Sequence, residues 1–236
     1  MNFLENTHPS WHSSLEKAFA SLDKEYLTFL QKDTSYFPDK NNFLNAFREL
    51  PKEQTKYILF GQDPYPREKS AIGVAFIDGA VKSIFSENGL SKEVNKATSL
   101  RNFIKMALVA NGLLQEDTSQ KAIAKLDKKN LINSIYELKE NFEKNGVLLL
   151  NTALIFTEKK DSKQHSTMWQ PFIQTLLDEI SPDTQLILFG NFAKEIKKRL
   201  SPKQNAIELE HPYNHSFIHN KEAHKLFSPM KLLEKG

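Results

Sequence analysis

The sequence predicts a single three-layer α/β domain with a central, mostly parallel four-stranded sheet and helices on both faces. Four short, nearly continuous apolar runs alternate with longer amphipathic stretches along the chain. Apolar strands separated by helices are typical of a parallel sheet that is covered on both sides. The chain also contains no internal repeat and no linker rich in Gly, Ser or Pro, which favours one domain over residues 1–236.

The individual elements follow from the spacing of the apolar residues. Residues 1–50 form an N-terminal helical part, in which Leu15, Phe19, Leu22, Tyr26 and Leu30 recur at helical spacing and predict a helix over 13–32. The predicted strands are 57–60, 147–150, 185–189 and 206–209. The predicted later helices are 99–109, 131–144, 170–180, 192–200 and 221–233.

Composition excludes several classes of protein. The 236 residues carry 32 basic and 29 acidic side chains, and the absence of cysteine excludes disulfides and thiolate zinc sites. No apolar run approaches the roughly 18 residues needed to cross a bilayer, and no apolar signal segment follows Met1. We therefore expect a cytoplasmic protein without membrane association. The excess of positive charge lies in residues 186–236, where 194–199 are either a solvated helix face or a surface for phosphates.

Polar residues follow three of the four predicted strands. Asp63 follows the first strand, Asn151 ends the second, and His211 follows the fourth. Ligands of open α/β sheets bind at the carboxyl ends of the strands, so an Asp, an Asn and a His are expected on one rim. Singly, each has a purely structural alternative as a turn or strand-capping residue. The exit of the third strand at 190–191 is interpreted as a turn into the next helix.

The three histidines His211, His215 and His219 have the four-residue spacing that aligns metal ligands on a helix. Pro212 and the polar residues around it disfavour a helix there, and no suitably placed carboxylate follows. The sequence therefore predicts no metal site.

Four motifs occur in order along the chain: Gly61-Gln62-Asp63-Pro64-Tyr65, Gly73-Val74-Ala75-Phe76, Leu148-Leu149-Leu150-Asn151 and His211-Pro212. Together they resemble the signature of the family 1 uracil-DNA glycosylases, and weaker agreement extends over a core of 57–227. The resemblance implies a monofunctional hydrolase that extrudes deoxyuridine from single- or double-stranded DNA, releases uracil and leaves an abasic site in base excision repair. It also implies a monomer that needs no metal or cofactor, and a surface that a small protein inhibitor could bind.

The resemblance assigns a role to each motif residue. Asp63 stabilises the positive charge of the sugar and orients the attacking water. His211 donates a hydrogen bond to the uracil O2, assisted by backbone amides near Gln62. Asn151 pairs with O4 and N3 and leaves cytosine mismatched. Phe76 stacks on the base, and Tyr65 excludes the methyl group of thymine. For the two aromatic residues, ordinary packing is the alternative.

The resemblance also implies contacts with the DNA backbone. Ser99 and Ser216 match serines that grip phosphates beside the extruded nucleotide. The remaining predicted DNA-binding residues are Pro66, His165, Asn191, Tyr213 and His215.

Departures from the family pattern lie on the DNA-binding side. Pro66 replaces a histidine that most cellular members carry, although some viral members also have proline, and 96–98 replaces a proline-rich stretch. His215 replaces the leucine wedge that fills the gap left by the extruded base, unless Phe217 takes that role. We therefore expect weaker extrusion from duplexes and a relative preference for single strands. Two alternatives remain, namely a non-catalytic member that binds DNA or protein, and a glycosylase with an altered base range.

Overall fold

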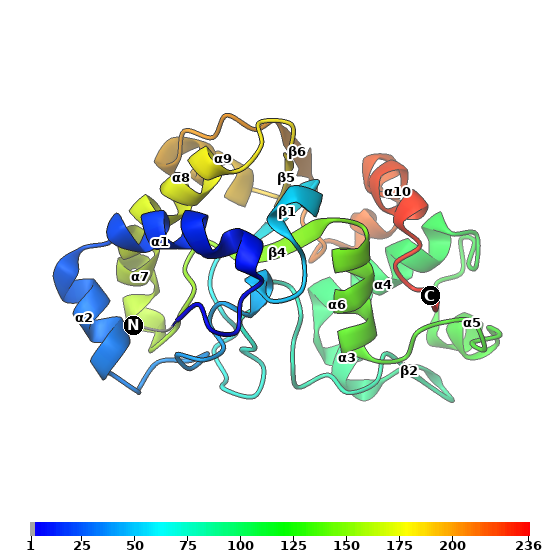
Figure 1. Ribbon diagram of the computed structural model, residues 1–236. Helices are drawn as coiled ribbons and strands as arrows, with labels where there is room; N and C mark the ends of the chain where they lie inside the picture. Colours follow the sequence, from blue (N-terminus) through cyan, green and yellow to red (C-terminus); the bar gives the residue numbers. More distant parts are fainter. Residues whose placement is uncertain (1–2) are drawn as a thin grey trace. The chain divides into compact units, whose positions relative to one another are not determined.

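The computed structural model describes residues 3–236, drawn in Figure 1, and the chain forms two compact units. The first unit contains Met1–Asp78 and Gly146–Glu208, and the second contains Gly79–Asn145 and Leu209–Gly236. None of the helices in residues 3–236 combines the length and the apolar character needed to span a membrane. The predicted α/β class is confirmed by a four-stranded sheet surrounded by helical elements.

The four predicted strands are all present in one sheet. They are β1 (Tyr57–Gly61), β4 (Val147–Asn151), β5 (Gln185–Phe189) and β6 (Ala206–Leu209), and their spatial order is β4-β1-β5-β6. Strand β1 is parallel to both β4 and β5, with Gly61 opposite Asn151. Each strand matches its predicted range to within one residue. For β1, β4 and β5 the reason is a short apolar run bounded by polar residues or glycine.

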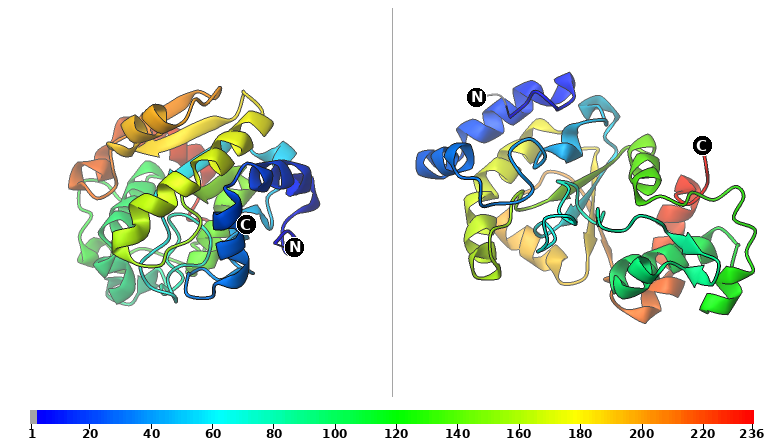
Figure 2. Two further views of the ribbon diagram at one scale, coloured as in Figure 1. Left: turned by 90° about the vertical axis from the view of Figure 1, so that its left-hand side faces the viewer. Right: turned by 90° about the horizontal axis from the view of Figure 1, so that it is seen from below.

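Successive side chains of the strands point to opposite faces of the sheet. One set joins the apolar core of the first unit, and the alternate set is buried as well, with Leu59, Leu149 and Ile187 at 2% exposure or less. Burial of both sets explains why the strands read as continuous apolar runs. The helices of the first unit are α1 (His12–Ala20), α2 (Lys24–Lys32), α7 (Ser162–Met168), α8 (Gln170–Glu179) and α9 (Phe192–Arg199). Helices α1 and α8 pack side by side (Figure 2).

The single helix predicted over 13–32 is wrong, because the chain forms two helices there. Helix α1 ends at Ala20, and Asp23 begins α2 by accepting hydrogen bonds from the backbone N–H groups of Glu25 and Tyr26. An aspartate in this position is a strong N-cap. The apolar spacing continues across the break, since Leu15, Leu22 and Leu30 all enter the same core.

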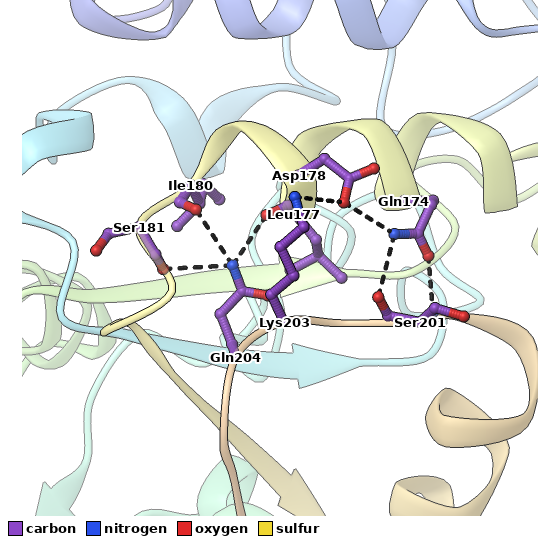
Figure 3. A network of polar contacts seen from close by, with 8 residues as sticks. All are labelled: Gln174, Leu177, Asp178, Ile180, Ser181, Ser201, Lys203 and Gln204. Carbon is purple, nitrogen blue, oxygen red and sulfur yellow. Dashed lines mark hydrogen bonds and ion pairs between the residues drawn. The ribbon is translucent and has the colours of Figure 1, made fainter.

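A side chain closes the C-terminal end of α8. The Gln204 amide nitrogen donates to the carbonyl oxygens of Leu177, Ile180 and Ser181 at 2.9, 3.3 and 3.3 Å (Figure 3). The Leu177 and Ser181 carbonyls also accept from the backbone N–H groups of Ile180 and Thr184, so Gln204 adds a second donor to each. Gln204 itself is 5% exposed. The segment between α9 and β6 is thereby attached to α8.

The second unit is mostly helical and has an aromatic core. Rings of Phe103, Phe142, Phe217 and Phe227 pack with centroids 5.0–6.5 Å apart. Its elements are β2 (Phe85–Ser86), β3 (Gly89–Leu90), α3 (Lys92–Lys96), α4 (Thr98–Ala110), α5 (Gln120–Ala124), α6 (Ile135–Lys144) and α10 (Lys221–Phe227). The 3-10 helices of the two units are η1 (Pro9–Trp11), η2 (Asn45–Phe47), η3 (Lys52–Gln54), η4 (Lys159–Asp161), η5 (His215–His219) and η6 (Ser228–Met230).

Two helices of this unit are shorter than predicted. Helix α6 begins at Ile135 rather than at 131, because Ser134 and Glu137 form a capping box. Helix α10 ends at Phe227 rather than at 233, and Pro229 lies in the 3-10 turn that follows.

Candidate active site

Three strand ends of the first unit carry predicted site residues at the same edge of the sheet. Asp63 follows β1, Asn151 is the last residue of β4, and Asn191 follows β5. Because β4 and β5 both run parallel to β1, the carboxyl ends of these three strands meet at one edge. Asn151 is buried, Asp63 is half-buried and Asn191 is exposed, so the three residues differ in their access to solvent.

Gly61 makes the space that Asn151 occupies. A Cβ atom on Gly61 would lie 2.3 Å from the Asn151 Oδ1 and 3.1 Å from the Cβ of Ala75. Asn151 is 6% exposed, and within residues 3–236 its side-chain amide has no hydrogen-bond partner. The donor and acceptor groups of this amide are therefore not used by other protein groups in the described residues. It is suited to a ligand that supplies the complementary groups.

The chain leaving β1 is fixed to the chain leaving β4. The Gln62 carbonyl oxygen accepts from the Thr152 hydroxyl and from the Ala153 backbone N–H, both at 2.9 Å. The Thr152 backbone N–H donates to the Gly61 carbonyl at 3.0 Å. These three bonds continue the parallel ladder past its last register pair and hold the backbone that presents Asp63.

Tyr65 and Phe76 lie next to each other on the loop that follows β1. The Tyr65 hydroxyl donates to the Phe76 carbonyl at 3.3 Å, and burial raises the pKa of Tyr65 to about 12. Phe76 has a φ of 67°, which is rare for a bulky residue and marks a local constraint. Its ring centroid lies 6.2 Å from that of Phe189.

An ion pair closes the same loop. Arg67 follows the exposed Pro66 and donates to the carboxylate of buried Asp78 at 3.0 Å. Sequence reasoning missed this pair, because the eleven-residue separation of Arg67 and Asp78 has no local signal.

His165 is not at the surface, contrary to the predicted DNA contact. Its ring is 5% exposed, with Nδ1 2.7 Å from the Tyr26 hydroxyl and Nε2 2.9 Å from the Thr157 hydroxyl. Burial lowers the pKa of His165, so the ring is neutral at pH 7. With both nitrogens engaged inside the protein, His165 links α2 to α7 and leaves no group for a phosphate.

In the second unit, His211 is held in a defined tautomer. The Tyr213 backbone N–H donates to the His211 Nδ1 at 3.0 Å, which requires a lone pair on that nitrogen. In the neutral ring the proton is therefore on Nε2. Desolvation lowers the pKa of His211, which favours the same neutral form. His211 can thus donate a hydrogen bond through Nε2 without carrying charge.

The His211 loop is clamped from inside by Asn102, which sequence reasoning missed. The Asn102 amide, on α4 and 1% exposed, donates to the carbonyl oxygens of 212, 213 and 214 at 2.8–3.3 Å. Tyr213 is 67% exposed, and His215 is also exposed. Phe217 is completely buried against Phe103, so the suggestion that it replaces the leucine wedge is wrong.

The two predicted phosphate-binding serines differ in their surroundings. Ser99 is in the first turn of α4, whose N-cap, Ala97, provides no side-chain hydrogen bond. Free N–H groups of that kind attract anions. Ser216 instead hydrogen-bonds to the Glu210 carboxylate, so a phosphate would have to displace this contact. His215 and His219 lie in a 3-10 helix, and residues 3–236 contain no cluster of three side chains that could hold a metal ion.

Comparison with known proteins identifies the family. The model of the uracil DNA glycosylase superfamily matches residues 47–232, which include every motif described above. The chain belongs to this superfamily.

Solved and curated members of the uracil-DNA glycosylase superfamily cover most of the chain. The wild-type UNG of Nitratifractor salsuginis is 50% identical, covers 99% of this chain and 96% of its own, and superposes with a TM-score of 0.97. The uracil-DNA glycosylase of Borreliella burgdorferi (strain ZS7) is 28% identical over 88% of this chain and 84% of its own. A mimivirus UNG Y322F in complex with UGI is 18% identical, covers 87% of this chain and 70% of its own, and has a TM-score of 0.54, which shows likeness of fold alone.

Proposed function

We propose that this protein is a uracil-DNA glycosylase, which hydrolyses the bond between C1′ of deoxyribose and N1 of uracil and leaves an abasic site. The observation that carries the proposal is that Asp63 and Asn151 lie at the carboxyl ends of two adjacent parallel strands, where Gly61 lies opposite Asn151 and leaves space for its side chain. The carboxylate can stabilise the positive charge of the sugar, and the Asn151 amide can form hydrogen bonds with the base.

Asp63 is the proposed catalytic carboxylate. Breaking the C1′–N1 bond separates a cationic sugar from an anionic base, and a fixed negative charge under the sugar lowers the energy of that state. Within residues 3–236, Asp63 has no ion-pair or hydrogen-bond partner, so its oxygens are available to the sugar and to the attacking water. The backbone bonds of Gln62 hold the carboxylate in position before substrate arrives.

Asn151, Phe76 and Tyr65 are the proposed base-recognition residues. The Asn151 amide oxygen accepts from N3–H of uracil and its nitrogen donates to O4, whereas cytosine presents an acceptor at N3 and a donor at N4. Phe76, held in a constrained backbone conformation, offers a ring face to the base. Tyr65, fixed by its bond to the Phe76 carbonyl, occupies the space beside C5 where thymine carries a methyl group.

We assign the hydrogen bond to uracil O2 to His211. Its Nε2–H is a neutral donor, because the Tyr213 N–H occupies Nδ1 and desolvation lowers the pKa of the ring. A neutral donor strengthens its bond as negative charge develops on the departing base, yet it does not protonate O2.

DNA binding, extrusion of the base, action as a monomer and a cytoplasmic location belong to the same proposal. Exposed Tyr213 is the large apolar side chain of the His211 loop and is better suited than His215 to fill the gap in a duplex. A small protein inhibitor remains a prediction, in line with the mimivirus UNG Y322F complex with UGI. A non-catalytic DNA-binding protein is the second candidate, favoured by Pro66 and by the polar His215.

The decisive experiment measures uracil release from matched single- and double-stranded oligonucleotides in EDTA, with thymine and cytosine substrates as controls. We expect release of uracil alone, loss of activity in Asp63→Asn, and a lower rate on duplex than on single strands. Tyr213→Ala should lower the duplex rate further and spare the single-strand rate, with His215→Ala as the matched loop control. DNA binding without release from either substrate would refute catalysis and leave the binding protein.

A further inference from the structure

A polar hollow of about 150 Å³ adjoins Asp63 in the first unit. Asp63 and Thr152 form its wall on the side of the strand ends, and Lys163 of α7 and Arg199 of α9 contribute two cationic side chains. Neither cation takes part in the function proposed above. The hollow therefore places two positive charges beside the carboxylate that is proposed to lie under the sugar.

Arg199 is held in position before any ligand binds. Its Nη1 donates to the Ser166 hydroxyl at 2.5 Å, and its backbone carbonyl accepts a hydrogen bond from the Gln170 amide. The side chain is still 40% exposed, so its other N–H groups face the hollow or solvent. A guanidinium that is already fixed loses less conformational entropy on binding, and its planar fork matches the oxygens of a phosphate.

The hollow also contains two carboxylates, those of Asp63 and Glu195. Glu195 also lines it, but its Oε2 lies 4.0 Å from Arg199 Nη2, at the limit of an ion pair, and both side chains are well exposed. Such a pair contributes little and yields readily to a competing anion. Asp63 is the other carboxylate, and its proposed partner is the cationic sugar, so the two cations remain for the anionic part of the nucleotide.

We propose that Lys163 and Arg199 bind a backbone phosphate of the uracil-containing strand next to the extruded nucleotide. The inference rests on the proposed function. A deoxyribose over Asp63 carries phosphates on both sides of its sugar, and Pro66 offers no cation to either of them. Lys163 and Arg199 thus supply charge on the α7–α9 side of the sugar, where they position the strand for attack at C1′.

The test measures binding of a single strand that carries a tetrahydrofuran analogue of the abasic site, between 50 and 200 mM salt. Each lost phosphate contact lowers the slope of log Kd against log salt by about 0.7 on single strands. We expect part of that decrease in Lys163→Ala and in Arg199→Ala, and the full decrease of about 0.7 in the double variant, which loses the phosphate contact altogether, with weaker binding. Lys198→Ala is the control, because it removes the same charge from the same helix but does not line the hollow.

Two further variants address charge and folding. Arg199→Lys should keep most of the slope, and Glu195→Gln should bind more tightly than the wild type. Thermal unfolding of every variant identifies any loss of folded protein. Slopes equal to that of Lys198→Ala in both single variants, or no gain in Glu195→Gln, would overturn the inference. Uracil release by the wild type is measured in parallel, since absence of release defeats the proposed function, whereas release with unchanged slopes defeats only the phosphate site.

Discussion

Replacement of Gly61 by alanine tests the geometry of the base site directly. The new Cβ would lie 2.3 Å from the Asn151 Oδ1, whereas Cβ atoms in proteins essentially never come closer than 3.0 Å to another heavy atom. One of the two must therefore move by at least 0.7 Å. The backbone of Gly61 is not left-handed, so alanine causes no backbone strain there, and the effect falls on the Asn151 amide.

A misplacement of this size should be costly for catalysis. A shift of about 1 Å can lower a rate by about 10²-fold, which corresponds to roughly 2.7 kcal/mol of transition-state stabilisation. We expect kcat/KM of Gly61→Ala on a uracil-containing single strand to fall by about that factor. Overpacking of the core should reduce the free energy of unfolding by about 1–3 kcal/mol, which thermal or denaturant unfolding measures.

A double-mutant cycle with Asn151→Ala separates the two effects. If Gly61→Ala acts through the Asn151 amide, it should have little further effect on kcat/KM once that amide is gone. The reasoning is refuted if folded Gly61→Ala keeps kcat/KM within about threefold of the wild type. It is equally refuted if the variant loses the full 10²-fold in the Asn151→Ala background.

Two other predictions concern pH and stability. The pKa of His211 lies below its ordinary value, and protonation of Nδ1 breaks the hydrogen bond from the Tyr213 N–H. We therefore expect kcat/KM to fall only as pH drops through a midpoint below about 6.5, and this step should be absent in His211→Gln. A midpoint above that value would contradict the assignment. The unfolded chain binds this proton more readily, so His211 also contributes stability above about pH 6.5 that decreases at lower pH. Gln204→Ala removes the donor of the Ile180 carbonyl and one of two donors of the Leu177 and Ser181 carbonyls, and should cost about 1–3 kcal/mol, lowering Tm by about 2–4 °C per kcal/mol. The control for Gln204→Ala is Lys203→Ala, which removes only an exposed ion pair at 3.7 Å and should cost less than about 1 kcal/mol. Equal losses of unfolding free energy in the two variants would show that the hydrogen bonds of the Gln204 amide do not stabilise the protein.

Local patterns in the sequence determined the strands and most of the helices. Strands β1, β4 and β5 are short apolar runs bounded by polar residues or glycine, and this information lies within a few positions. The sequence prediction missed the break between α1 and α2, although Asp23 is a typical N-cap residue. The reason is that apolar residues keep their helical spacing on both sides of the break. The spacing of apolar residues predicts which side of a helix faces the core, but it does not predict where the helix is interrupted.

The sequence also determined which chemical groups follow the strands, since the motifs of Asp63, Asn151 and His211 are contiguous. Only the tertiary structure decided which residues are available to a ligand. It buried His165 between two hydroxyl groups and Phe217 in an aromatic core, while leaving Tyr213 67% exposed. It also brought Arg199 into the hollow that Asp63 lines, and Asn102 into contact with the His211 loop. The contacts of His165 with Tyr26 and of Asn102 with the His211 loop join residues more than a hundred positions apart, and no local pattern of residues encodes contacts at that separation.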